Sequence, residues 1–243
     1  MTPRSIPIAT ADGVCPSTLF VPAKAPAAAV IVYMDAFGPR PAMDEIATRL
    51  AGLGYAVPVP DLFYRFGAYG PFDARTAFSV AETGQQLRKM ITQTTQAKTI
   101  ADTGAFLEAL AQEGFGGKVG TVGYCMGGGR AINAAGAWPD RIVAAASLHG
   151  GNLASDAPDS PAANAARLKA RIYVGVAGVD NSFPPEQSAR LARALREAEV
   201  DHTIENYVGV GHGWCVSDHS VYDETAAERH WKRLETLFSE TLG

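Results

Sequence analysis

The segment "VGYCMGGG" at positions 122–129 sets Cys125, one of only three cysteines, between Gly123 and Gly127. A G-x-Cys-x-G segment between a strand and a helix forms a sharp turn that holds a nucleophile in an exposed, strained backbone position. Glycine is needed on both sides because a side chain would clash where the strand and the helix crowd together. The N-terminus of the following helix favours a thiolate and a developing oxyanion. Cys125 is therefore the candidate nucleophile.

An acid and a histidine follow Cys125 in the order that a triad on such a turn requires. Asp180 ends the apolar run "ARIYVGVAGVD" (170–180), and His212 lies in "GVGHGW". A histidine beside the thiol can take its proton, and a carboxylate can orient that histidine. We predict that Cys125, Asp180 and His212 form a catalytic triad.

The rest of the chain predicts the elements that would carry these residues. Apolar β-branched runs predict buried strands, and apolar residues at helical spacing predict helices between them. Strands that are apolar throughout indicate a mostly parallel central sheet with helices on both faces, in a single α/β domain covering 1–243. We expect strands in 27–37, 55–63, 118–124, 141–150, 170–180 and 201–212, and helices in 42–54, 100–111, 128–138, 188–195 and 227–238.

Functional residues of such sheets gather at the carboxyl ends of the strands. Asp35 and His149 also fall at predicted strand ends. His149, in "SLHGG", is expected either to line a pocket or to have a structural role. The histidines at 202, 219 and 230 lie among polar positions, and we expect them at the surface.

Charge and composition argue against several other kinds of protein. The chain has 25 acidic and 21 basic residues, a net charge of −4, and no basic cluster, which disfavours nucleic acid and anionic membranes as partners. The longest apolar run, 27–34, is too short to span a bilayer, and no signal-peptide pattern opens the chain, so we expect a cytoplasmic protein. Three scattered cysteines fit neither a disulfide framework nor a zinc site, and we expect no metal and no cofactor.

Several blocks of the chain together resemble the dienelactone hydrolases, also called carboxymethylenebutenolidases. In order they are "VIVYMDAFG", "GYAVPVPDLFYR", "GKVGTVGYCMGGG", "VAGVDNSFPPEQ", "VGHGW" and "AAERHWKRLETLF". The resemblance implies an α/β-hydrolase fold that cleaves lactones or related esters through a thioester on Cys125. It implies that His212 is the general base and acid, that Asp180 orients it, and that the N–H groups of Met126 and Ala36 hold the oxyanion. The expected partner is a small-molecule ester or lactone, and the expected assembly is a monomer or homodimer.

Two positions depart from the best-known members of that family. Where these carry a glutamate that holds the resting thiol, this chain has Asp35, whose shorter side chain leaves the contact water-bridged or absent. Where they carry an arginine that grips the substrate carboxylate, this chain has Val216. We therefore expect neutral substrates to be preferred, with the alternative that Arg65, Arg75 or Arg88 supplies the charge.

Two other interpretations stay open from the sequence. A glutamine amidotransferase also carries its cysteine on such a turn, but its histidine belongs to a His-x-Glu pattern that "HGW" does not match. A non-catalytic or redox-sensing protein would keep the fold and use a reactive thiol, with Cys215 pairing reversibly with Cys125. The aromatic-rich loop at 64–78 is expected either to line an acyl pocket or to pack down against the body.

Overall fold

The computed structural model describes residues 3–26 and 28–243. Residue 27, the first of one predicted strand, and residues 1–2 lie outside the described part. The strands are β1 (Arg4–Thr10), β2 (Gly13–Phe20), β3 (Ala29–Tyr33), β4 (Val57–Pro60), β5 (Val119–Tyr124), β6 (Ile142–Leu148), β7 (Arg171–Val179) and β8 (His202–Gly211). The helices are α1 (Pro41–Gly52), α2 (Ala81–Gln93), α3 (Gln96–Gln112), α4 (Met126–Ala137), α5 (Pro185–Glu197) and α6 (Glu224–Leu242), with short 3₁₀ helices η1 (Tyr64–Phe66) and η2 (Pro161–Arg167).

The central sheet is parallel over five strands, in the order β3-β5-β6-β7-β8. Three further strands, β1-β2-β4, form an antiparallel extension. The two parts are joined where the N–H of Val30 donates to the carbonyl of Ala56 at 2.9 Å and the N–H of Ala56 donates to that of Ala28 at 3.0 Å. The predicted mostly parallel sheet is confirmed.

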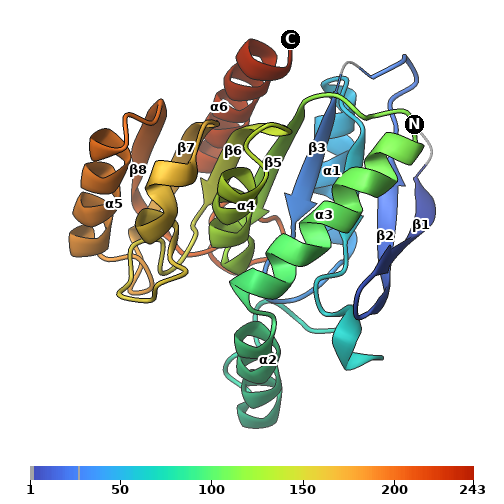
Figure 1. Cartoon of the computed structure of the whole chain (residues 1–243). Coiled ribbons are helices and arrows are strands. Elements are labelled where there is room, and N and C mark those ends of the chain that lie inside the picture. The colour runs from blue at the N-terminus through green and yellow to red at the C-terminus, as the bar shows by residue number, and fades with distance from the viewer. Residues whose placement is uncertain (1–2, 27) are drawn as a thin grey trace.

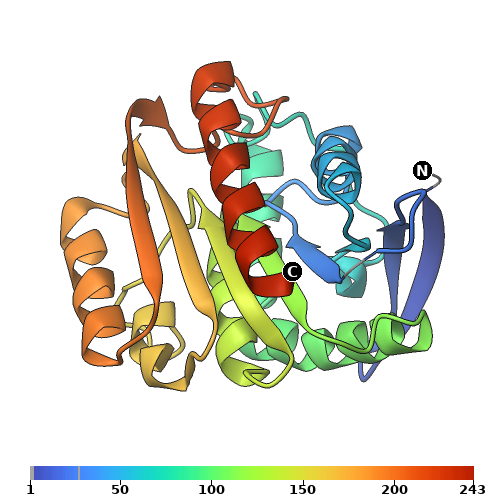
Figure 2. The ribbon, with the colours of Figure 1, turned by 90° about the horizontal axis from the view of Figure 1, so that it is seen from above.

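Helices cover both faces of this sheet, as predicted. Helices α1 and α6 lie on one face, and α3, α4 and α5 with η2 lie on the other (Figure 2). The predicted apolar stripe of the last helix is buried, including Trp231, Leu234 and Phe238. Helix α4 is buried along almost its whole length, which explains its run of alanine and glycine.

Two features of the fold were not expected from the sequence. The first is the antiparallel hairpin of β1 and β2, whose strands contain Pro7 and Pro16 opposite each other. Proline cannot donate to a ladder and is confined to edges or strand ends, so these residues hide the strand pattern. The second is α2, which buries only Gly84, Leu87 and Met90 and therefore has too short an apolar stripe to stand out.

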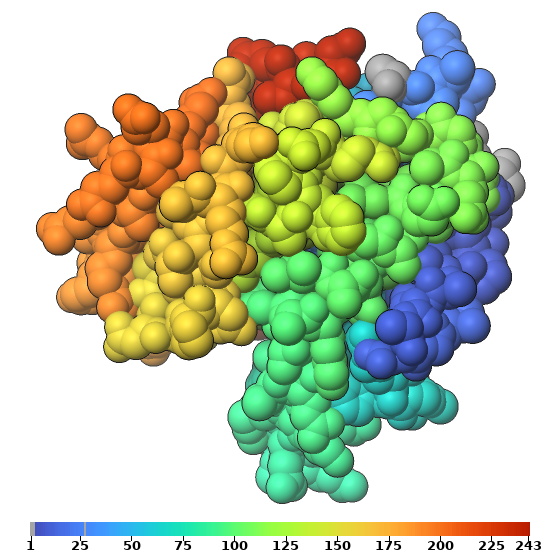
Figure 3. Space-filling model, in the orientation of Figure 1, coloured from blue at the N-terminus to red at the C-terminus, as the bar shows by residue number. Residues whose placement is uncertain are grey.

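Helix α2 projects beyond the edge of the sheet at which the parallel strands end (Figure 1). The space-filling view shows the same region as a protrusion from the body (Figure 3). Among the described helices, none combines the length and apolar character needed to cross a membrane.

Candidate active site

Cys125 occupies a strained turn between β5 and α4. Its φ of 54° lies in the left-handed region, where a side chain other than glycine is uncommon. A Cβ at Gly123 would lie 2.0 Å from the carbonyl oxygen of Gly127, and one at Gly127 would lie 2.2 Å from that of Tyr33. Neither position can therefore hold a side chain, which is the physical reason for the glycines around the cysteine.

His212 and Asp180 lie together at the ends of the neighbouring strands β8 and β7. The Nδ1 of His212 lies 2.7 Å from Oδ2 of Asp180. The other oxygen, Oδ1, accepts hydrogen bonds from the Ser182 hydroxyl at 2.6 Å and the Ser182 N–H at 2.8 Å. The carboxylate is thereby fixed from two sides, and its charge points at the imidazole. Sequence reasoning missed Ser182, which also lies 3.3 Å from Nδ1 of His212.

The electrostatics of the pair favour a protonated imidazole. Burial disfavours the charged form of His212, but the nearby charge of Cys125 and the hydrogen bond with Asp180 outweigh it and raise the pKa of His212 to about 10. Burial also opposes the Asp180 carboxylate, yet its hydrogen bond and charge interaction with His212 bring the pKa of Asp180 below its usual value. The arrangement can thus stabilise a thiolate on Cys125 by an adjacent imidazolium.

Two backbone N–H groups near the turn, those of Met126 and Ala36, have no carbonyl acceptor within the described part of the chain. Met126 is the first residue of α4, so its N–H has no carbonyl acceptor within the helix. The N–H of Ala36, on the loop after β3, has no hydrogen-bond partner among the described residues. The start of α4 packs on the end of β3, as the close approach of Gly127 to the carbonyls of Tyr33 and Met34 shows.

A cavity of about 830 Å³ contains Cys125, Asp180 and His212 in its wall. Phe37 and Phe78 add apolar surface, and their rings meet edge to face at 5.5 Å. The aromatic loop contributes only partly to this wall. Its Tyr69 and Phe72 stack on each other, with ring centroids 6.0 Å apart, and neither is part of the wall. The cavity is large enough for a small ester or lactone.

Asp35 is committed to partners other than the cysteine. Its carboxylate accepts hydrogen bonds from Arg40 at 2.6 and 2.8 Å and from the N–H of Phe37 at 3.0 Å, and it lies 3.1 Å from Nε2 of His219. Burial opposes the charged carboxylate, but the hydrogen bonds from His219 and Arg40 bring the pKa of Asp35 below its usual value. The described contacts of Asp35 do not include Cys125.

The expected position of two histidines was wrong. His219 lies in the wall of the cavity, with Asp35 beside it. His230 on α6 is fully buried, and burial lowers its pKa to about 3. Both were expected at the surface because their sequence neighbours are polar. His202 is half-buried at the start of β8.

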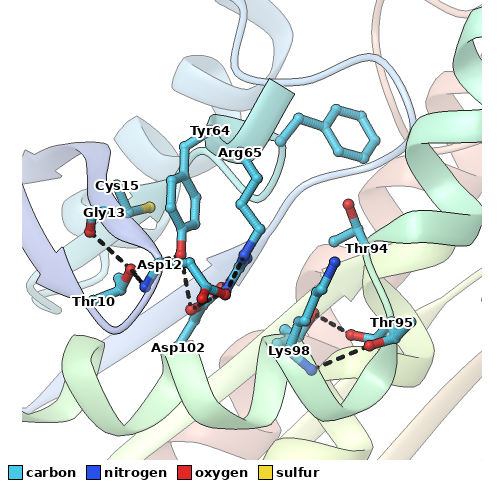
Figure 4. Close-up of polar contacts among 12 residues, drawn as sticks. Thr10, Asp12, Gly13, Cys15, Tyr64, Arg65, Thr94, Thr95, Lys98 and Asp102 are labelled. Carbon is cyan, nitrogen blue, oxygen red and sulfur yellow. Dashed lines mark hydrogen bonds and ion pairs between the residues drawn. The ribbon is translucent and has the colours of Figure 1, made fainter. Parts of the chain in front are cut away.

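The residues expected to decide substrate charge do not reach the cavity. Val216, the predicted substrate-binding position, is fully buried in the hydrophobic core and is not part of the cavity wall. Arg65 pairs with Asp102 at 2.7 Å and with Asp12 at 2.7 Å, in a cluster between η1, the β1–β2 turn and α3 (Figure 4). Arg75 and Arg88 are exposed outside the wall.

A different arginine lines the cavity. Arg130 on α4 is only 7% exposed and makes no ion pair with a carboxylate among the described residues. Its guanidinium donates to the carbonyls of Met126 at 2.9 Å, Ile91 at 3.4 Å and Thr94, so it anchors the end of α2 to α4. Burial lowers the pKa of Arg130 to about 10. The only sequence feature that could have predicted a buried position for Arg130 is its place in a helix rich in alanine and glycine.

The other two cysteines are separate from this chemistry. All three cysteines are free thiols, and Cys15 and Cys215 are buried. Burial raises the pKa of Cys215 well above that of an ordinary thiol. A buried, protonated thiol is a poor partner for disulfide exchange, which weakens the redox-sensing interpretation. Within 3–26 and 28–243, no group of three His, Cys, Asp or Glu side chains is arranged to hold a metal ion.

The fold is that of the α/β-hydrolases, with its candidate nucleophile on the turn after β5, the second strand of the parallel sheet. The family model of the dienelactone hydrolase family matches residues 16–242, and the chain belongs to that family. It is 28% identical over 222 residues to the carboxymethylenebutenolidase of Pseudomonas putida, covering 89% of this chain and 87% of the relative.

Solved structures share this fold. A provisionally assigned dienelactone hydrolase from Klebsiella pneumoniae superposes with a TM-score of 0.86 at 23% identity, covering 98% of each chain. A dienelactone hydrolase-like promiscuous phosphotriesterase from metagenomic libraries superposes with a TM-score of 0.80 at 26% identity, covering 100% of this chain and 99% of that one.

Proposed function

We propose that the protein is a carboxylic ester hydrolase that cleaves lactones or activated esters through a covalent thioester on Cys125. The observation that carries the proposal is the meeting of three groups at one cavity. Cys125 is on its strained turn, His212 is beside it, and Asp180 lies 2.7 Å from the far side of the imidazole. This is the nucleophile, base and orienting acid that covalent catalysis needs.

The reaction follows from these positions in two halves. The thiolate of Cys125, paired with the His212 imidazolium, attacks the ester carbonyl, and the N–H groups of Met126 and Ala36 stabilise the oxyanion. The C–O bond then breaks, the leaving oxygen takes the proton from His212, and a thioester remains. Water gives a proton to His212 as it attacks the thioester, and the carboxylic acid and the thiolate are released.

The nucleophile itself narrows the substrate class. A thiolate is a good nucleophile but also a good leaving group. The tetrahedral intermediate on Cys125 therefore breaks its C–S bond and returns to substrate unless the alcohol of the ester is also a good leaving group. Esters with acidic alcohols and enol lactones meet that condition, whereas unactivated amides do not. The Pseudomonas putida relative, a carboxymethylenebutenolidase, supports a lactone as the substrate.

A panel of lactones and aryl esters tests the proposal on the wild-type protein, three single variants and one double variant. We expect Cys125→Ala and His212→Ala each to lose at least roughly a thousandfold in kcat/KM, since triad members act together. Asp180→Asn should lose less than either. Double substitution of Cys125 and His212 should be little worse than one alone. Circular dichroism of each variant shows whether the fold is intact, and undiminished turnover by folded Cys125→Ala would exclude the proposal.

A further inference from the structure

His149 contacts the backbone of Cys125 from outside the cavity. It follows β6, is 1% exposed, and is not part of the cavity wall. Its Nδ1 accepts a hydrogen bond from the backbone N–H of Cys125 at 3.1 Å, an N–H that also donates to the carbonyl of Leu148 at 3.1 Å. A nitrogen that accepts this bond carries no proton, so the proton of the neutral ring is on Nε2. Burial, reinforced by the charges of neighbouring histidines, holds the pKa of His149 well below its usual value.

The same ring touches the candidate base. The ring centroids of His149 and His212 are 4.9 Å apart at an interplanar angle of 66°. The ring of Trp214, two residues after His212, lies 5.3 Å from that of His149 between centroids, at an interplanar angle of 72°. Trp214 also stacks on Tyr207 of β8, with ring centroids 4.7 Å apart. One buried side chain therefore contacts the backbone of the nucleophile, the ring of the base and the loop that carries the base.

The backbone of His149 is also strained. Its φ of 39° lies in the left-handed region, although it is not a glycine. Gly150 and Gly151 follow directly and would accept such a conformation at no steric cost. A residue other than glycine held in this conformation costs conformational free energy, and such strain is found most often at functional sites. Its N–H donates to the carbonyl of Gly175 at 2.8 Å, which fixes the turn from β7.

We propose that His149 is a positioning residue that holds the Cys125 turn and the His212 ring in their reactive relation, without itself transferring a proton. This inference rests on the function proposed above for Cys125 and His212. Because His149 lies outside the cavity wall, its loss should lower kcat and leave KM nearly unchanged. Because its contact with Cys125 is through an acceptor, a substitute that keeps an acceptor should keep most of the rate.

Two substitutions separate the hydrogen bond from the backbone conformation. Asparagine tolerates a positive φ and keeps a side-chain acceptor, whereas glycine relieves the backbone strain but removes the acceptor and the ring. We expect His149→Gly to lower kcat roughly tenfold to a hundredfold, the size of effect produced by misplacing reacting groups by about 1 Å. KM should stay within about twofold. His149→Asn should retain the larger part of kcat.

The rate at which iodoacetamide alkylates Cys125 at pH 7, followed by mass spectrometry, is a second readout that needs no substrate. It should fall in His149→Gly and be largely restored in His149→Asn. Should the glycine variant not fold, His149→Ala provides the same comparison. An equal loss of kcat in His149→Asn and His149→Gly would overturn the positioning role. Wild-type values of kcat and of the alkylation rate in both variants would also overturn it. Cys125→Ala in the same esterase assay tests the proposed function separately, because its activity does not depend on what His149 does.

Discussion

At the scale of the residue, the hydrogen bonds of Asp35 connect it to groups other than the Cys125 thiol. Arg40, His219 and the N–H of Phe37 engage both carboxylate oxygens, so this acid is not available to hold Cys125 neutral. The charge of Cys125 is instead coupled to His212. We therefore expect Cys125 to react with electrophiles before any substrate binds.

Iodoacetamide alkylation of the three cysteines, resolved by peptide mass spectrometry, tests this inference. Cys125 should react fastest because Cys15 and Cys215 are buried, and burial raises the pKa of each of those two thiols. A non-hydrolysable substrate analogue should slow the reaction of Cys125 by occupying the cavity. Acceleration by the analogue would instead show a thiol that substrate activates, and equal rates at all three cysteines would contradict the pairing with His212.

The sequence predicts some single residues well and others poorly, for a physical reason. Cys125, Asp180 and His212 could be selected because chain order and strand ends bring them to one edge of the sheet. His219 and Arg65 could not be placed, because each is fixed by an acid far away in the chain, Asp35 and Asp102 respectively. The polarity of the neighbouring residues in the sequence does not predict partners that are distant in the chain.

At the scale of the element, one glutamate ties β8 to its neighbours. Glu205 on β8 accepts hydrogen bonds from Arg229 and Arg233 on α6 and from Tyr173 on β7, at 2.6 to 3.0 Å. Burial opposes its charge, but these donors outweigh it and lower the pKa of Glu205 to about 2. A carboxylate whose pKa is lowered by folding stabilises the protein at any pH above its pKa in the unfolded chain, which is ~4.3 for glutamate. That contribution is lost as the pH falls toward 2.

Glu205→Gln should therefore lower the free energy of unfolding at pH 7 by about 1 kcal/mol, since solvent screens part of the network. Urea unfolding at pH 7, 4 and 3 measures the difference from wild type, which should shrink as the pH falls. Glu113→Gln is the matched control, because Glu113 pairs with Arg4 at the surface, where ion pairs contribute little. A Glu205→Gln difference that is constant with pH would show that the charge of Glu205 has no part in stability.

The elements differ in how much the sequence reveals of them. Strands β5, β6 and β7 are continuous apolar runs because helices cover them on both sides, and so their pattern predicts them. The β1–β2 hairpin lies at the sheet edge, where Pro7 and Pro16 are tolerated and obscure the alternation. Helix α2 buries too little apolar surface to produce a helical stripe.

At the scale of the whole molecule, the positions of the arginines relative to the cavity are the basis for a prediction about substrate charge. Arg65 is engaged with Asp12 and Asp102, Arg75 and Arg88 are exposed elsewhere, and Arg130 donates to backbone carbonyls. A substrate carboxylate would enter the cavity without a dedicated guanidinium, and an unpaired charge there is costly.

We expect kcat/KM for a neutral ester to exceed that for its carboxylated analogue by roughly tenfold, the effect of one unpaired polar contact. Arg65→Gln should leave this ratio unchanged. Steady-state kinetics on the matched substrate pair measures the ratio in wild type, Arg65→Gln and Arg130→Met. A wild-type preference for the carboxylated substrate that disappears in Arg130→Met would assign carboxylate recognition to Arg130 and reverse the expectation.

The proposed reaction passes through an acyl group bonded to the sulfur of Cys125. Rapid acid quenching during turnover of a slowly deacylating aryl ester, followed by mass spectrometry of the digested protein, detects that bond directly. We expect an added acyl mass on the peptide that contains Cys125, formed at the rate of the initial burst of released phenol and absent in Cys125→Ala. Steady hydrolysis with no acyl mass on that peptide and no burst, or an acyl group on another residue, would contradict it.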